Sequence, residues 1–337
     1  GRAASAASIR ALQLARQLGW ADKLGLAHYD VGFSYQAGGD YEKAKQCFRA
    51  ALQIWHKANM PQGELRARVA LGACYYYLGR HDLNQQHIEQ AMQIAEQIPW
   101  NLSVTTVMSG AYNNAGDLYH WLGHNDAALG YFGKALELAR APTRREDLKA
   151  IAPPNKRGEA WALGNIGLVH ASRAEFAQAF EYISQALELA SLVEEHFFEG
   201  LLHTDMSHYL LLTGALEPAL EHAEEAIRLG NAIGQTESIA RALLALTCVK
   251  AELNEQAEAF AVASQAMEHA RSVGSQEVSG LAHRTTGMLL RQHLGALEHA
   301  LSHFRVARQL FRLGRNFKQE AATSVCYASV LVSLGRA

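Results

Sequence analysis

The sequence predicts an all-α solenoid, in which two-helix units stack one on the next. Small residues recur about every 40 positions, and only six prolines interrupt the 337 residues. Apolar residues follow one another at the three- and four-residue spacing of an amphipathic helix. A chain of this length normally splits into two globular domains. A repeat array can stay continuous instead, because each unit packs only on its neighbours.

The repeat can be aligned on a small residue near the middle of the first helix of each unit. This residue falls at Gly32, Gly72, Gly116, Gly167, Ser207, Thr247, Gly287 and Ala328. Four of the intervals are 40 residues, and the others are 44 before Gly116, 51 before Gly167 and 41 before Ala328. A period of this length is typical of a solenoid.

Other positions follow the same register within each unit. A large residue comes three positions after the small one, a turn residue seven, a small residue twelve, an apolar residue sixteen and an alanine nineteen. In the unit of Gly116 these are Tyr119, Gly123, Ala128, Phe132 and Ala135. We expect the small residues to let the two helices approach closely, and the turn glycine to end the first helix. The unit of Gly287 carries one extra residue, so its turn glycine is Gly295.

The units at the two ends look incomplete. Residues 3–18 resemble a second helix without its first, and the closing "YASVLVSLGRA" resembles a first helix without its second. Natural solenoids usually close with an atypical polar cap. The sequence therefore predicts a single solenoid over residues 1–337, with about seven full repeats and a half repeat at each end. We expect this solenoid to be a piece of a longer protein.

The longest interval contains the stretch "APTRREDLKAIAPPNKRGEA", from Ala141 to Ala160, which holds three of the six prolines. The pair Pro153-Pro154 is unsuited to a helix interior. We expect an inserted loop over residues 141–157. Two interpretations stay open, a plain surface insertion and a loop that packs into a groove or contacts a partner.

Composition argues against several classes of function. A net charge of -2 provides no general basic surface for nucleic acid, and no apolar run reaches the length of a membrane helix. Neither a catalytic motif nor a phosphate-binding or dinucleotide-binding glycine pattern is present. The histidine pairs His120/His124 and His299/His303 lack a third ligand of suitable spacing. We therefore expect no enzyme, no metal and no cofactor. Four scattered cysteines indicate a reducing, cytoplasmic setting: Cys47, Cys74, Cys248 and Cys326.

Two stretches resemble the tetratricopeptide repeat: "LGACYYYLGRHDLNQQHIEQAMQIA", Leu71 to Ala95, and "NAGDLYHWLGHNDAALGYFGKALELA", Asn114 to Ala139. The period is longer than the usual one of about 34 residues. It resembles the long-helix variety in kinesin light chains, polarity adaptors with Leu-Gly-Asn repeats, peptide-sensing Rap-type regulators and sensor regions of bacterial STAND-type signalling ATPases. The resemblance implies a right-handed superhelix whose first helices line a concave groove.

By this resemblance, four positions of each first helix should face the groove: three and two before the small residue, and one and four after it. The candidates for ligand binding at or beside these positions are Phe33, Tyr76, Asn113, Asn114, Asp117, His120, Trp121, Asn165, Asp205, His208, Arg284 and Arg291.

Asn114 and Asn165 occupy equivalent positions in "YNNAG" and "LGNIG". The resemblance implies that they hydrogen-bond the backbone of an extended peptide, because a carboxamide donates and accepts at once. The alternative is a bond to a neighbouring helix. Aromatic candidates such as Phe33, Tyr76 and Trp121 either anchor an apolar ligand side chain or fill space between helices.

Arg284 and Arg291 lie about two helical turns apart on one face. They could meet an acidic ligand, or remain solvated surface arginines. The lysine-based carboxylate clamp of chaperone-binding relatives is absent, because the matching positions hold other residues: Tyr29, Val69, Asn113 and Gly164.

These observations favour a protein- or peptide-binding module that acts as the sensor or regulatory domain of a larger signalling protein. An effector domain of the same polypeptide is one candidate partner. A scaffold or self-association segment is the alternative, motivated by the uncapped ends. An enzyme stays a third hypothesis only because the inserted loop could complete a site.

Overall fold

The computed structural model describes residues 10, 20–37, 40–99, 102–141, 143–145, 150–152, 154–314 and 316–336. They belong to two compact units, one ending at Val169 and the other beginning at His170. Apart from Arg10, the half repeat predicted from residues 3–18 lies outside the described residues.

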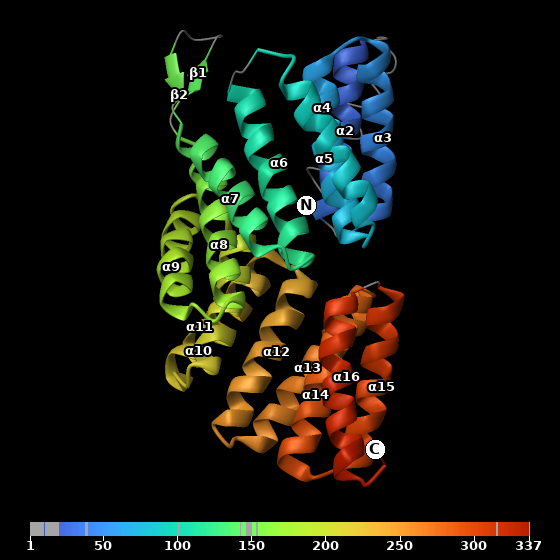
Figure 1. The fold of residues 1–337 in the computed structure, drawn as a ribbon, viewed down its shortest axis with the longest axis vertical. Coiled ribbons are helices and arrows are strands. Elements are labelled where there is room, and N and C mark those ends of the chain that lie inside the picture. Colours follow the sequence, from blue (N-terminus) through green and yellow to red (C-terminus); the bar gives the residue numbers. More distant parts are fainter. Residues whose placement is uncertain are drawn as a thin grey trace. The chain divides into compact units, whose positions relative to one another are not determined.

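The first unit is built of helical hairpins (Figure 1). Within it α2 packs against α3, α4 against α5, and α6 against α7, while α4 also contacts α2 and α6. Its helices are α2 (Ala21–Ala37), α3 (Tyr41–Lys57), α4 (Pro61–Tyr77), α5 (His81–Ala95), α6 (Leu102–Trp121), α7 (Asn125–Arg140) and α8 (Lys156–Ser172), whose last turn crosses into the second unit.

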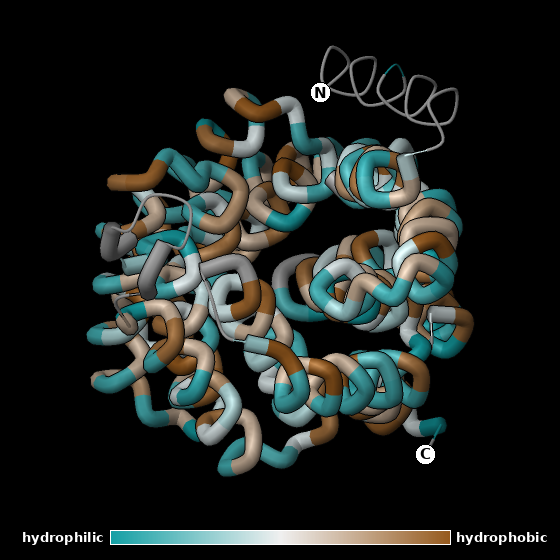
Figure 2. Tube along the Cα trace, turned by 90° about the horizontal axis from the view of Figure 1, so that it is seen from above, coloured by the Kyte–Doolittle hydropathy of each residue, from teal (hydrophilic) through white to brown (hydrophobic). Residues whose placement is uncertain are grey.

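The second unit repeats this arrangement. There α10 packs against α11, α12 against α13, and α14 against α15, and the first helices α10, α12 and α14 contact one another in turn. Its further helices are α9 (Phe176–Leu192), α10 (His196–Leu212), α11 (Leu216–Ile233), α12 (Thr236–Glu252), α13 (Gln256–Val273), α14 (Gln276–Leu289), η1 (Leu290–Leu294), α15 (Leu297–Leu313) and α16 (Phe317–Ser333). The predicted all-α solenoid is thereby confirmed. Hydrophobic and hydrophilic residues alternate along the helices (Figure 2), as amphipathic packing requires.

The small residue of the first helix meets the apolar residue sixteen positions later. A methyl group on Gly116 would come within 2.4 Å of the Phe132 ring, and one on Gly32 within 2.6 Å of the Phe48 ring. Both rings are fully buried. The predicted close approach of the two helices is therefore confirmed. The corresponding contacts in two other repeats join Gly72 to Ile88 and Gly287 to Phe304.

The turn between the two helices of a repeat requires a residue in the left-handed conformation. Gly123 and Gly214 both have φ of 82°, a value that glycine adopts without steric cost. The same turn position holds Ala174 at φ 60° and Asn254 at φ 61°. The fold thus keeps this backbone conformation even where the residue is not glycine. The predicted turn at Gly39 lies outside the described residues.

Some helix starts are fixed by side-chain caps. The Asp40 side chain accepts the backbone N–H of Lys43 at the start of α3, at 3.1 Å. Asn316 accepts the backbone N–H of Gln319 at the start of α16, at 3.2 Å. Such caps satisfy N–H groups that have no partner inside the helix.

The extra residue of the Gly287 repeat forms a π-helical turn. Helix α14 ends at Leu289, η1 continues from Leu290 to Leu294, and Gly295 follows with φ 58°. A single π turn admits one more residue without ending the helix. Arg291 lies in this turn.

The predicted insertion at 141–157 contains a short antiparallel ladder in which β1 (Thr143–Arg145) pairs with β2 (Ala150–Ala152). The sequence indicated a loop there, because a charged stretch is followed by the short apolar run Ala150–Ala152 and two prolines, without the alternation from which strands could be recognised. Helix α8 also begins at Lys156, inside the predicted range.

A buried carboxylate fixes both ends of this insertion. Glu159 accepts Nε of Arg140 and Nζ of Lys156, each at 2.8 Å. The two cations come from the end of α7 and the start of α8. The insertion is therefore attached to the solenoid at the points where it leaves and rejoins it.

Two histidine pairs join first and second helices in the second unit. The Nδ1 atoms of His203 and His222 are 2.7 Å apart, and those of His283 and His303 are 3.2 Å apart. At such distances one neutral ring donates to the other. Burial and the neighbouring ring lower the pKa of His203, and that of His283 to about 4. Burial likewise lowers the pKa of His222 and of His303.

Replacing Gly116 with Ala should destabilise the protein by about 1–3 kcal/mol, because the added methyl group would overlap the Phe132 ring. Gly133→Ala is the matched control. Gly133 lies on α7, where an added Cβ would meet nothing within 4 Å. This control should gain up to about 1 kcal/mol from helix propensity. Urea denaturation checks both changes, and a stabilised Gly116→Ala variant would contradict the packing account.

The histidine pairs predict a loss of stability on acidification. An unfolded histidine has a pKa of about 6.5, so lowered pKa values in the fold mean that the unfolded chain binds more protons. Stability should be full above pH of about 6.5 and fall as pH drops toward 4. The charged groups around the two pairs also act on them: Glu199, Glu221, Glu225 and Arg228, and Arg271 and His299.

The variant His283→Leu/His303→Val should flatten this dependence, since the intervening repeat uses Leu243 and Val262 at the same two positions. Urea midpoints between pH 4.5 and 8 measure the effect. His269→Gln, a partly exposed histidine of α13, serves as control. An unchanged pH profile in the double variant would contradict the assignment.

Candidate functional site

The predicted ligand-facing residues differ in how far solvent reaches them. Phe33 is 44% exposed, whereas Asn113 and Asn165 are only 7% and 6% exposed. His208 is also exposed. The remaining candidates are partly exposed: Tyr76, Asn114, Asp117, His120, Trp121, Asp205, Arg284 and Arg291. Most of the predicted side chains are thus partly accessible to solvent.

We give the name first-unit face to the candidates that lie on α4, on α6 and in the middle of α8: Tyr76, Asn113, Asn114, Asp117, His120, Trp121 and Asn165. Helix α4 contacts α6 along this face. The start of α8 also lies against α6, because a Cβ on Gly158 would be 3.3 Å from Ser109 Oγ.

Two carboxamides of this face have unsatisfied polar atoms. Asn113 Oδ1 and Asn165 Nδ2 are buried and have no hydrogen-bond partner among the described residues. One atom is an acceptor and the other a donor, which are the two groups that a peptide unit would match. Leaving such an atom unpaired costs about 1–3 kcal/mol. Asn114, the neighbour of Asn113, is only half-buried.

Asp117 lies one helical turn from Asn113 on α6. The side chain keeps partial access to solvent but is surrounded by protein on most sides, and this desolvation raises the pKa of Asp117 to about 7. No described cation forms an ion pair with it in the structure. His120, one turn further along α6, forms a hydrogen bond within its own repeat. Its ring nitrogen Nδ1 lies 3.0 Å from Asn125 Oδ1 at the start of α7.

Aromatic rings cluster where α4 and α6 end. The ring centroid of His81 lies 5.5 Å from that of Tyr76 and 3.8 Å from that of Trp121. Sequence reasoning did not single out His81, because it is the first residue of a second helix and falls outside the register used for the search. The structure therefore connects two predicted aromatic candidates through a third ring.

Phe33 belongs to a separate aromatic contact on α2. Its ring centroid lies 4.8 Å from that of Tyr29 and 5.3 Å from that of Phe48. Part of the ring packs between the helices, and the remainder is open to solvent. Both interpretations of this residue therefore remain compatible with its position.

In the second unit, α10, α12, α14 and η1 present what we call the second-unit face: Asp205, His208, Arg241, Arg284 and Arg291. Arg241 was not predicted. Its Nη2 lies 3.1 Å from Glu237 Oε1 and 3.3 Å from Glu277 Oε1. The four-residue spacing of Glu237 and Arg241 on α12 was the available sequence signal for this pair.

Asp205 shares this electrostatic environment. Burial raises the pKa of Asp205 to about 7, and the charge of Arg241 acts against that rise. Burial and the charge of Arg284 lower the pKa of His208. Arg241 thus acts electrostatically on Asp205, and Arg284 on His208.

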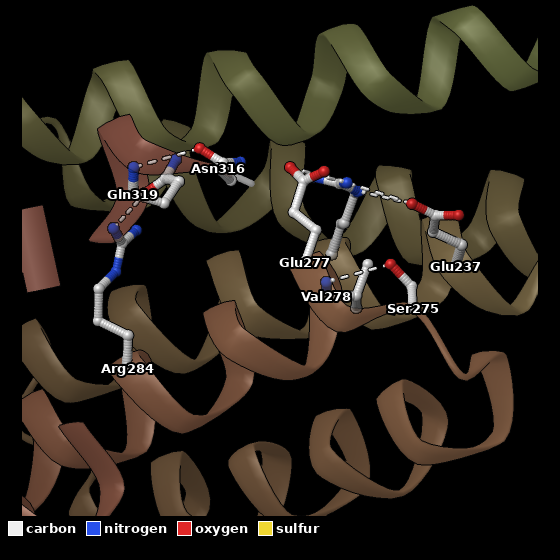
Figure 3. A network of polar contacts seen from close by, with 8 residues as sticks. Glu237, Ser275, Glu277, Val278, Arg284, Asn316 and Gln319 are labelled. Atoms are coloured by element: carbon white, nitrogen blue, oxygen red, sulfur yellow. Dashed lines mark hydrogen bonds and ion pairs between the residues drawn. The ribbon is translucent and has the colours of Figure 1, made fainter. Parts of the chain in front are cut away.

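Arg284 and Arg291 make neutral contacts with α16. Arg284 Nη1 donates to Gln319 Oε1, and Arg291 Nη1 donates to Ser329 Oγ at 3.2 Å. Figure 3 shows Arg284 extending toward Gln319, while Glu237 and Glu277 converge elsewhere on the face. Desolvation lowers the pKa of Arg284.

Both faces offer hydrogen-bonding, charged and aromatic groups for recognition. Across the described parts of the chain, no three His, Cys, Asp or Glu side chains gather as a metal-binding group. None of the described helices combines the length and apolar character that crossing a membrane requires.

Comparison with solved structures identifies similar folds. The Rap conjugation gene regulator of plasmid pLS20, in complex with the Phr* peptide, aligns with TM-score 0.63 and 18% identity over 87% of this chain and 76% of that one. A Rap protein complexed with Competence and Sporulation Factor aligns with TM-score 0.56 and 15% identity over 92% and 77%. Aspartyl phosphate phosphatase F from Bacillus subtilis aligns with TM-score 0.56 and 14% identity over 95% and 73%.

Family models of the tetratricopeptide repeat match residues 23–97 and 109–142. The matched ranges cover most of the hairpins α2–α3, α4–α5 and α6–α7, whose contacts between a glycine of the first helix and an apolar side chain of the second are described above. Residues 23–97 and 109–142 are therefore tetratricopeptide repeats, set in an all-α solenoid of helix-turn-helix units.

Proposed function

We propose that this protein binds a peptide or a protein segment on the faces formed by its first helices. The observation that carries the proposal is the pair of buried, unsatisfied carboxamide atoms, Asn113 Oδ1 and Asn165 Nδ2, on the first-unit face. Buried polar atoms are nearly always paired in folded proteins. A partner that supplies both a donor and an acceptor would remove this cost.

An extended peptide supplies these groups at every residue, whatever its sequence. In this proposal Asn113, Asn114 and Asn165 bind the peptide backbone. Asn114 is accessible as it stands, while Asn113 and Asn165 need a change of side-chain rotamer to present their unpaired atoms. The Tyr76, His81 and Trp121 cluster lies where α4 and α6 end and provides an apolar anchor for a ligand side chain.

The relatives support the class of ligand. Two of the similar structures are complexes, one with the Phr* peptide and the other with Competence and Sporulation Factor. Their similarity to this chain concerns the fold, and the unsatisfied carboxamides give an independent physical reason to expect a peptide here.

A regulatory role follows as part of the same proposal. Binding on a stack of repeats favours the arrangement of helices that fits the ligand, so occupancy can bias a larger signalling protein between two states. We place this module in the cytoplasm, as a sensor domain that acts by binding and not by catalysis.

Binding is tested by selecting peptides from a random dodecapeptide library and measuring their affinity by fluorescence anisotropy. The variant Asn114→Ala/Asn165→Ala should lose about thirtyfold in affinity, since two hydrogen bonds of about 1 kcal/mol each disappear. Gln53→Ala/Gln93→Ala is the matched control, because it removes two exposed carboxamides from second helices. The control should bind as the parent does.

Equal affinity of the parent and the Asn114/Asn165 variant, both folded by circular dichroism, would place the ligand elsewhere. A parent protein that selects no peptide would overturn the proposal. Selection of segments of this chain itself would instead favour self-association.

The unpaired carboxyl of Asp117 predicts that Asp117→Asn stabilises the free protein. The pKa of Asp117 is higher in the folded protein than in the unfolded chain, so the unfolded chain loses this proton at a lower pH. The free energy of unfolding therefore falls as pH rises from about 4 to about 7. The gain from Asn should therefore be small at pH 4 and full above pH 7, as measured by urea midpoints. Glu137→Gln, an exposed carboxylate on α7, should show no such trend. Destabilisation of Asp117→Asn at pH 8 would indicate a structural role.

A further inference from the structure

Two arginines of the second-unit face are paired very differently. The guanidinium of Arg241 lies within 3.3 Å of two carboxylates, those of Glu237 and Glu277. The guanidinium of Arg284, on the neighbouring helix α14, donates to the neutral carboxamide of Gln319. Figure 3 shows Arg284 directed toward Gln319, and Glu237 and Glu277 directed toward a second guanidinium that they share. The charge of Arg241 is therefore balanced by carboxylates of the protein, whereas the hydrogen-bond partner of Arg284 is neutral.

The surroundings of Arg284 supply no negative charge to balance it. The ionisable groups that act on it are the thiols of Cys248 and Cys326, and among the described residues no carboxylate joins them. Desolvation of a guanidinium without a counter-charge is unfavourable. The single bond to Gln319 uses one of five N–H donors and leaves the others for a ligand.

A second guanidinium continues this feature along the same face. Arg291 follows Arg284 by about 10 Å along the helix axis, and its printed contact is again neutral, with Ser329 Oγ. Arg291 lies in the π turn η1, and π turns occur frequently at functional sites. The register places Arg284 three residues before its repeat's small residue, the same position that Asn113 occupies on the first-unit face.

We propose that Arg284, with Arg291 as a second contact, receives a carboxylate of the peptide bound on the second-unit face. This inference rests on the proposed function and adds the chemistry of the ligand, namely an acidic side chain or a free C-terminus. A guanidinium binds a carboxylate through two parallel N–H···O bonds. A peptide without a carboxylate at this place would leave the charge desolvated and unpaired, so the face discriminates against it.

The probe is a random dodecapeptide library selected in parallel on the parent protein, on Arg284→Gln and on Arg312→Gln. Arg312 is the matched control, because its exposed guanidinium already lies 2.6 Å from Glu320. We expect a carboxylate requirement in the pools from the parent and the control, and its absence from the Arg284→Gln pool. A peptide selected on the parent should bind Arg284→Gln at least about tenfold more weakly.

Synthetic versions of a selected peptide identify the source of the carboxylate. One version replaces Asp or Glu by the amide, and another carries an amidated C-terminus. Loss of affinity in either version supports the inference, and unchanged affinity in both overturns it. Peptides that bind the parent and Arg284→Gln equally overturn it too, yet leave peptide binding in place. A parent that selects no peptide at all overturns the proposed function together with this inference.

Gln319→Glu keeps the test valid should Arg284→Gln fold poorly. It retains Arg284 and supplies the missing counter-charge from α16. We expect a higher urea midpoint than that of the parent and loss of the preference for acidic peptides, since the internal carboxylate competes with the ligand. An undiminished preference in Gln319→Glu would overturn the inference.

Discussion

The repeats of Gly32, Gly72, Gly116 and Gly287 depend on the contact between this glycine of the first helix and an apolar side chain of the second. At Gly116 and Gly32 the helix backbone lies so close to Phe132 and Phe48 that no Cβ fits. This contact fixes how far apart the two helices lie, and therefore which side chains of the first helix remain uncovered. The uncovered positions are those that form the two faces. Packing inside a repeat thus decides which polar groups a ligand can reach.

The sequence predicted this part of the structure because the contact constrains residue type. Only glycine or another small residue fits the first helix, so the register is visible without an alignment. The ladder of β1 and β2 and the π turn were not predictable in the same way, since one extra residue such as that before Gly295 can be absorbed as a bulge, a longer loop or a π turn. Pairing between side chains of different helices was also beyond the register. Arg241 was missed because its partner Glu277 comes from a neighbouring helix, and His81 because it begins a second helix and so lies outside the register.

The candidate residues differ from the rest of the repeat in how they affect the free energy of unfolding of the protein without its ligand. A position that serves packing is satisfied by the fold itself, as Phe132 is by Gly116. Asn113, Asp117, Asn165 and Arg284 instead carry polar or charged groups that the described fold leaves incompletely paired. Residues of this kind destabilise the free protein, and such sites cluster where proteins bind other molecules. Stability measurements on the free protein can therefore separate them from structural polar residues before any ligand is known.

The hydrogen bond from Arg284 to Gln319 shows that a single substitution would give this guanidinium a counter-charge within the protein. A glutamate at position 319 would carry a carboxylate oxygen where glutamine carries its amide nitrogen. It would give Arg284 the same kind of partner that Glu237 and Glu277 give Arg241. With glutamine, α14 and α16 are joined by a neutral bond, and the guanidinium keeps most of its capacity for an external carboxylate. At position 319, a glutamate would make the packing of α14 on α16 more stable, whereas a glutamine leaves Arg284 able to bind a ligand carboxylate. This chain carries glutamine.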